Sequence, residues 1–237
     1  MPTRTASRRN QLIFRAYGFI LYLLLAWLPL NTSMAQIAPS TEEVADYDLL
    51  QAATFRNDTN AVQTLLSNGA NPNLRDGRQR TLVHIAAHAS AYDTLRILVK
   101  AGADINAMEF QDYDAITIAA VANDVQMLKL ALELGGNPTT VTSPYEGTAL
   151  IAAAHLGHVE VVKNLIEAGS PLDHINNLHW TALIEAVVLG DGGANHTEIV
   201  RILVEAGADT NITDRNGVSP LGLANDFGYE TMIAILK

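Results

Sequence analysis

The chain has 237 residues, of which 49% are hydrophobic and 17% are charged, and it contains no cysteine. A disulfide framework and a catalytic thiolate are therefore excluded. The formal net charge of −10 disfavours nucleic acid as a partner, because affinity for phosphate comes mainly from clustered Lys and Arg.

The first 35 residues have the three parts of a secretory signal peptide. These are a basic start, an apolar run and small residues at a cleavage site: Arg4, Arg8, Arg9 and Arg15, then residues 16–30, then Ser33, Met34 and Ala35. The alternative is an uncleaved membrane anchor, although about 15 apolar residues are fewer than the roughly 20 that span a bilayer. Four of the 15 Lys and Arg residues and none of the 25 acidic residues lie in this segment, so the remaining chain carries a charge of −14.

After a short linker at residues 36–45, residues 46–237 repeat a phrase in which Thr, Asp or Ser precedes an apolar run with small alanines. The five phrases begin at Thr81, Asp114, Thr148, Thr181 and Ser219, in steps of 33, 34, 33 and 38 residues. A glycine also recurs after a second apolar stripe, at Gly69, Gly102, Gly135, Gly169 and Gly207. A period of this size predicts one supersecondary unit, repeated, that buries its apolar face only against its neighbours.

Each unit is predicted to contain two helices. The Thr, Asp or Ser that begins the phrase can cap the first helix, because its side-chain oxygen accepts from a free N–H of the first turn. Counting back three, four, seven and eight residues from each glycine gives one face of a second helix, and only Thr94 on these faces is polar. The glycine then ends that helix in the left-handed conformation. In the clearest unit the second helix is predicted over residues 159–168.

Three segments of the chain, residues 147–154, 156–162 and 205–211, resemble the ankyrin repeat. The resemblance implies an all-α solenoid of about six helix-turn-helix units, each with a turn or β-hairpin finger, over residues 46–237. The first and last units are expected to act as caps.

The sequence departs from the family pattern at several positions. The family's phrase histidine is present only as His84, while Thr117, Ile151, Ile184 and Gly222 stand at the equivalent places. We therefore expect weaker hydrogen bonding between fingers at those places, and a less rigid array. The fifth unit carries an insertion at residues 191–196, which should bulge from the helical side without interrupting the stack.

The resemblance implies protein binding through the finger tips and the inner face of the first helices. Carried over to this sequence, the partner-binding residues are Arg78, Arg80, His88, Phe110, Gln111, Tyr113, Tyr145, His155, Leu178, Trp180 and Arg215. Phe110, Tyr113, Tyr145 and Trp180 fall in consecutive fingers, and exposed aromatic residues at neighbouring sites are typical of interface anchors. The alternative is that each ring packs over its own hairpin.

No catalytic, cofactor-binding or metal site is predicted. The sequence has no nucleophile elbow, phosphate loop or His-Glu-x-x-His motif, so we do not expect an enzyme. The paired acids Glu42 and Glu43 indicate a solvated end. Among the possible metal ligands, Asp191, His196 and Glu198 are the best-placed group in the sequence. A metal-dependent activity at residues 191–196 is kept as a remote alternative.

Together these features predict an exported, periplasmic and monomeric protein that binds another protein, with no membrane contact once the signal is removed. Its resemblance to exported bacterial ankyrin proteins suggests an accessory or scaffold role, with an oxidative-stress enzyme such as a catalase as a conceivable partner. The alternative is an inhibitor or immunity protein that blocks a toxin or hydrolase. The acidic charge would favour a partner with a basic surface.

Overall fold

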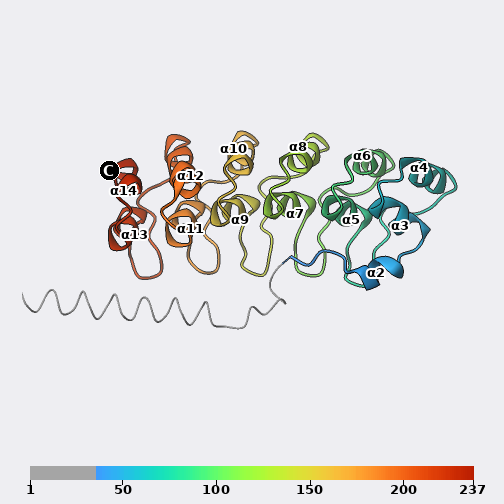
Figure 1. Ribbon diagram of the computed structural model, residues 1–237, viewed down its shortest axis with the longest axis horizontal. Helices are drawn as coiled ribbons and strands as arrows, with labels where there is room; N and C mark the ends of the chain where they lie inside the picture. Colours follow the sequence, from blue (N-terminus) through green and yellow to red (C-terminus); the bar gives the residue numbers. More distant parts are fainter. Residues whose placement is uncertain (1–35) are drawn as a thin grey trace, which may run out of the picture. The chain divides into compact units, whose positions relative to one another are not determined.

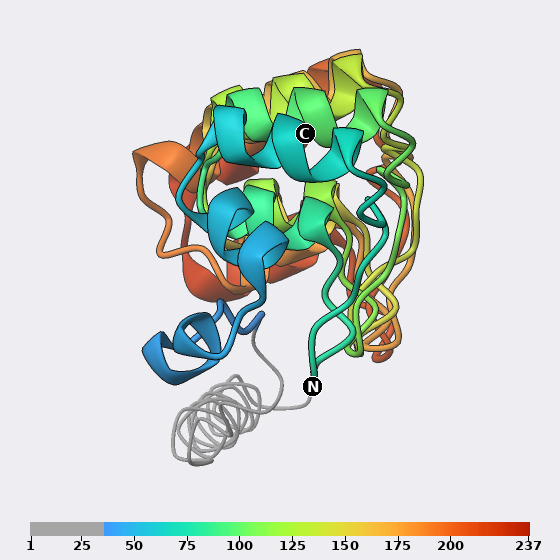
Figure 2. The same ribbon diagram turned by 90° about the vertical axis from the view of Figure 1, so that its right-hand side faces the viewer.

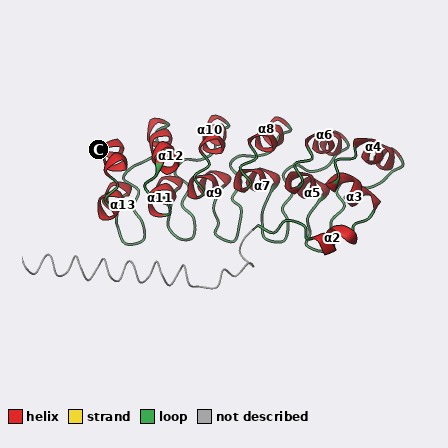
Figure 3. Cartoon of the chain, in the orientation of Figure 1, coloured by secondary structure: helices red, strands yellow, loops and turns green. Residues whose placement is uncertain are grey.

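A computed structural model describes residues 36–237, so the predicted signal peptide at residues 1–35 lies outside the described residues. Residues 36–237 are all-helical, as predicted, and two isolated β-bridges replace regular strands (Figure 3). The helices, in chain order, are α2 (Thr41–Ala45), α3 (Leu49–Phe55), α4 (Thr59–Ser67), α5 (Leu82–His88), α6 (Tyr92–Lys100), α7 (Ala115–Val121), α8 (Val125–Glu133), α9 (Ala149–His155), α10 (Val159–Glu167), α11 (Ala182–Val188), α12 (Ala194–Glu205), α13 (Pro220–Phe227) and α14 (Glu230–Leu236). Within this range none of the helices has the length and hydrophobicity needed to cross a membrane.

Helices α3 to α14 form six successive pairs, which we call the first to sixth units (Figure 1). The first helices of the units lie in one row and are called the inner helices; the second helices form the outer row (Figure 2). Long loops extend beside the inner row and connect one unit to the next. We call them the first to fifth fingers, at residues 75–81, 108–114, 142–148, 175–181 and 213–219.

Each inner helix from the second unit onward begins at the predicted phrase residue. The side chains of Asp114, Thr148, Thr181 and Ser219 accept from the backbone N–H three residues later. At the remaining start the N–H of Thr81 donates to Nδ1 of His84 instead. Capping therefore fixes where every one of these helices starts.

The recurring glycines end the outer helices, as predicted. Gly69, Gly102, Gly135, Gly169 and Gly207 follow the last helical turns and have φ between 87° and 95°. A Cβ at any of the five would meet no atom within 4 Å. The left-handed backbone, and not crowding, is therefore what favours glycine at these positions.

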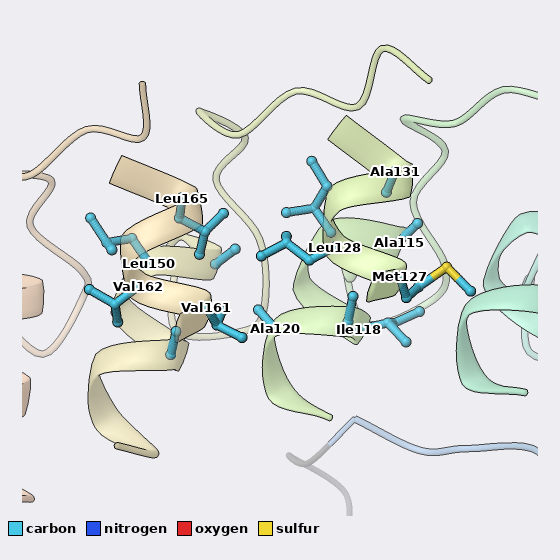
Figure 4. Close-up of a cluster of buried hydrophobic side chains, with 14 of the residues drawn as sticks. Ala115, Ile118, Ala120, Met127, Leu128, Ala131, Leu150, Val161, Val162 and Leu165 are labelled. Carbon is cyan, nitrogen blue, oxygen red and sulfur yellow. The ribbon is translucent and has the colours of Figure 1, made fainter. Parts of the chain in front are cut away.

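The core lies between neighbouring units. Figure 4 shows Ile118, Met127 and Leu128 of the third unit and Val161 and Val162 of the fourth, all fully or almost fully buried. The phrase alanines, such as Ala119 and Ala120, are also inaccessible to solvent, and their small side chains let the helices approach closely. Since each unit completes the burial of the next, stability is shared along the stack.

The insertion of the fifth unit does not interrupt the stack. Helix α11 packs against α9 and α13, and α12 packs against α10 and α14. The loop that holds the insertion contacts both neighbours: the hydroxyl of Tyr229 donates to the carbonyl of Gly190, next to the insertion, at 3.0 Å, and Nε2 of His196 lies 3.0 Å from the carbonyl of His155.

Candidate functional site

Four of the fingers share one turn conformation, and the third differs because Ser143 is also left-handed. In those four the first turn residue accepts hydrogen bonds from the backbone N–H groups two and four residues later; these residues are Asp76, Glu109, Asn176 and Asp214. In the third finger, Ser143 accepts from the N–H of Tyr145. Three residues after the first turn residue the backbone is left-handed in every finger, at Gln79, Asp112, Glu146, His179 and Gly217. The fingers therefore present equivalent positions that differ in side chain.

Neighbouring fingers are joined by hydrogen bonds near their tips. Backbone N–H groups donate to carbonyls of the preceding finger, from Phe110 to Arg78, from Ser143 to Asp112 and from Asn177 to Tyr145. The guanidinium of Arg215 adds a bond of 2.9 Å to the carbonyl of Asn177. The finger tips are thus held in a continuous row.

The phrase histidine contributes one further link between fingers. Nε2 of His84 lies 3.0 Å from the carbonyl of Tyr113, and the hydroxyl groups of Thr117 and Thr142 meet at 3.0 Å one unit later. Ile151, Ile184 and Gly222 have no polar side-chain atom that could make an equivalent bond. The hydrogen bonds at the finger tips are formed by other residues. Neighbouring fingers therefore remain joined in the units that lack a polar residue at the position of the phrase histidine.

Three of the predicted binding residues are exposed apolar side chains on consecutive finger tips. Phe110 is 48% exposed, Tyr145 38% and Leu178 40%. The guanidinium of Arg78 lies 5.6 Å from the centroid of the Phe110 ring, within cation–π range. Arg215 in the fifth finger is exposed as well. The second to fifth fingers therefore each present a predicted binding residue to solvent, and in the second, third and fourth fingers this residue is apolar.

Three of the predicted finger residues are not exposed, and for Tyr113 the packing alternative fits better. Arg80, Gln111 and Tyr113 are buried, and Trp180 is partly buried. Arg80, Tyr113 and Trp180 each directly precede the capping residue of an inner helix, where the finger returns to the helical layer. Gln111 is held close to the turn, because its N–H donates to the buried carboxylate of Glu109 at 2.8 Å. Tyr113 and Arg80 are therefore packing residues and not surface anchors.

The burial of Arg80 depends on the segment that precedes the first unit. Its guanidinium lies 2.6 Å from the carboxylate of Asp76 and 3.1 Å from that of Glu43 in α2. Glu43 also pairs with Arg78 at 2.6 Å. Burial alone would raise the pKa of Glu43, but hydrogen bonds from the Ser40 backbone and the two arginines lower this pKa to about 2. Residues 36–45, predicted as a linker, thus contain a helix paired with the first finger, and Glu43 is not part of a solvated end.

The inner helices carry the remaining predicted residues. His88 and His155 end α5 and α9 and occupy equivalent positions in the second and fourth units. Burial lowers the pKa of His88 to about 4, and the positive charges of nearby Arg80 and His84 act in the same direction. Leu156, next to His155, is 42% exposed and adds an apolar side chain to this face.

The structure also reveals a buried acid that the sequence reasoning missed. Glu185 of α11 is 3% exposed. Its Oε1 accepts from the side-chain amide of Asn176 at 3.0 Å, and its Oε2 lies 3.3 Å from Nδ1 of His155. A signal was present in the sequence, because Glu185 is an acid at a phrase position where the other four phrases have Ile85, Ile118, Ala152 and Leu223.

No group of three or more His, Cys, Asp or Glu side chains within residues 36–237 is arranged to hold a metal ion. In the insertion, Nδ1 of His196 lies 3.7 Å from the exposed carboxylate of Asp191. Glu198 pairs instead with Arg201 at 3.4 Å. The three residues of the remote metal alternative therefore do not converge.

Comparisons with known proteins agree with this architecture. The sequence matches the family described as ankyrin repeats (3 copies) over residues 49–142 and 116–214. It is 33% identical over 193 residues to the putative ankyrin repeat protein YahD of Escherichia coli K12, covering 81% of this chain and 94% of that protein.

Solved structures show the same likeness. An ankyrin repeat domain from Acinetobacter baumannii AYE is 36% identical with a TM-score of 0.75, covering 79% of this chain and 95% of that domain. The ankyrin repeat domain of Bcl-3, at 23% identity and a TM-score of 0.73, shares the fold; the match covers 80% of this chain and 85% of that one. With its capped helix pairs, left-handed glycines and hydrogen-bonded fingers, the chain belongs to the ankyrin repeat family.

Proposed function

We propose that the protein is exported to the bacterial periplasm and acts there, as a monomer, as an accessory or scaffold for another protein. Ankyrin repeats are protein–protein interaction modules and are generally not catalytic. The basic start, apolar run and small residues at 33–35 support export. An oxidative-stress enzyme such as a catalase is a partner that fits this role.

The observation that carries the binding role is the row of exposed apolar side chains at consecutive finger tips. Phe110, Tyr145 and Leu178 stand on backbone that is hydrogen-bonded to its neighbours. Apolar groups that solvent reaches on a pre-ordered surface are suited to binding, since little conformational freedom is lost when a partner covers them.

Substitution at the finger tips tests this role. The chain, expressed with its own N-terminus and a C-terminal tag, is cross-linked in periplasmic extract, and a double variant Phe110→Ser and Leu178→Ser should lose the captured partner. Leu49→Ser is the matched control, because Leu49 is 77% exposed in α3 but lies outside the fingers. Identical capture by the wild type and the double variant would contradict the proposal. The mass of the recovered chain, expected to begin at Gln36, tests export separately.

The charge of −14 beyond residue 35 favours a second candidate, an inhibitor or immunity protein for a toxin or hydrolase with a basic surface. Titration of the captured partner distinguishes the two roles. A scaffold should leave the partner's activity unchanged or raise it, whereas an inhibitor should abolish it at one equivalent.

A further inference from the structure

We propose that Glu185, His155 and Asn176 form a binding site for a positively charged side chain, Lys or Arg, of the partner protein. The inference rests on the proposed function, that this surface binds a protein, and it specifies the partner chemistry at one place on the surface. The site lies where inner helices α9 and α11 meet the fourth finger.

The buried carboxylate is the first step of the argument. Glu185 is 3% exposed, at a position that is apolar in the other four phrases, and burial of a charged group is costly unless the group is paired. Within residues 36–237, Oε2 of Glu185 accepts no hydrogen bond of normal geometry, and Nδ1 of His155 lies 3.3 Å from it. An apolar residue here would continue the packing of the other units, so packing does not explain the acid.

Asn176 adapts the fourth finger to this acid. Its Oδ1 accepts the N–H groups of Leu178 and Trp180, which form the turn, while its Nδ2 donates to Oε1 of Glu185 at 3.0 Å. The other fingers have Asp76, Glu109, Ser143 and Asp214 at this position. Among these side chains only the amide can accept for the turn and still donate two hydrogens elsewhere. The finger residue and the buried acid thus form a matched pair.

His155 connects the pair to the surface. Its side chain is 50% exposed, and in the tautomer that carries its proton on Nδ1, 3.3 Å from Oε2 of Glu185, Nε2 has a free lone pair. No other residue in the described part of the chain forms a hydrogen bond with Nε2. A neutral imidazole beside an ionised carboxylate leaves one negative charge on the pair, so an incoming N–H donor that is positively charged is attracted both locally and by the acidic domain. A partner carboxylate would be repelled.

The second unit provides an internal control. His88 occupies the position of His155, but Ile118 stands where the next unit would need an acid, and the positive charge of Arg80 acts on the imidazole more strongly than the negative charge of Asp76. A cation is therefore not attracted to His88. Two departures from the repeat, Asn176 and Glu185, meet His155 at the fourth and fifth units, and neither is present at the second and third.

The test uses N-acetyl-arginine amide as the probe and N-acetyl-citrulline amide as its neutral isostere. Both are titrated into the protein as recovered from the cell, and the imidazole and amide signals of His155 and Leu156 are followed by NMR. We expect saturable shifts with the arginine probe and binding at least about tenfold weaker with citrulline. Glu185→Gln and His155→Gln should each abolish the difference between probes, whereas His88→Gln should keep it.

An equal response to both probes, or none to either, would overturn the proposal. Circular dichroism checks that each variant is folded. Glu185 and His155 lie in different units, so the result does not rest on a single variant. If Glu185→Gln binds the captured partner as tightly as the wild type while the finger-tip variant does not, the cation site is wrong and the proposed function stands. If both the Glu185→Gln variant and the finger-tip variant capture the partner as well as the wild type does, the proposed function itself is rejected.

Discussion

The second and fourth units end their inner helices with the same residue, yet they place it in opposite electrostatic surroundings. His88 lies near Arg80 and beside a unit with Ile118, whereas His155 is 3.3 Å from the buried carboxylate of Glu185. The backbone position is the same because the repeat fixes it. The charge around that position is set by side chains of the adjoining finger and of the next unit, which the repeat does not fix.

The fingers show the same contrast. At the residue before the helix cap, Arg80 and Tyr113 are buried, and Arg80 requires Glu43 and Asp76 for charge compensation. At the tips of the third and fourth fingers, Tyr145 and Leu178 remain open to solvent. The position within a finger therefore decides burial, and the second finger shows both cases, since Tyr113 is buried while Phe110 at the tip is 48% exposed.

Transferring the buried acid from the fifth unit to the third should have the largest effect. Ile118→Glu places a carboxylate where Glu185 lies in the fifth unit, but the finger residue there is Glu109, which repels it, in place of Asn176, which donates to it. We expect a loss of about 3–5 kcal/mol in the free energy of unfolding, because a buried charge is left uncompensated. Urea denaturation measures it. A loss below about 1 kcal/mol would show that any unit tolerates the acid.

Removal of the buried ring should come next. Tyr113→Ala is expected to cost about 3 kcal/mol or more, as for other large buried side chains, while the exposed Tyr145→Ala should change the unfolding free energy by less than about 0.5 kcal/mol. The same denaturation experiment compares the two. Equal losses would mean that the two fingers do not differ in packing.

The helix pairs could be predicted from the sequence because local signals repeat. Thr148 caps a helix wherever its neighbours are, and Gly169 adopts a left-handed φ without help from other units. Those signals fixed the type, number and order of the helices, and the second helix predicted at residues 159–168 differs from α10 by one residue.

Burial in the fingers and the acid cluster could not be predicted in the same way. Arg80 is covered because Glu43, from a segment that has no repeat pattern, pairs with it. The surroundings of Glu185 come from a finger and from the preceding unit, so no local pattern brings Asn176 and His155 together. Alignment of the five phrases would have identified Glu185 as an exception, but it would not have shown which residues Glu185 contacts.

Acid should reveal the surroundings of His88. Its pKa is about 4 in the folded chain and about 6.5 in the unfolded chain, so as the pH falls below 6.5 the unfolded state takes up the proton first and stability is lost until about pH 4. Between pH 7 and pH 5 the wild type should lose roughly 1–2 kcal/mol more than His88→Gln. Denaturation at both pH values measures this difference, with His84 present in both proteins. Equal losses would mean that His88 is not shielded from protonation.

Replacing the acid at its own position should have the smallest effect on stability. Glu185→Leu restores the apolar residue found in the other phrases, and well-packed apolar replacements of buried charges are often neutral or stabilising. The lost bond to Asn176 opposes this gain, so we expect a change within about 1 kcal/mol in either direction. Denaturation of this variant beside Ile118→Glu completes the exchange between the two units. A loss of several kcal/mol would make Glu185 a structural residue, and the acid would then need no partner to account for it.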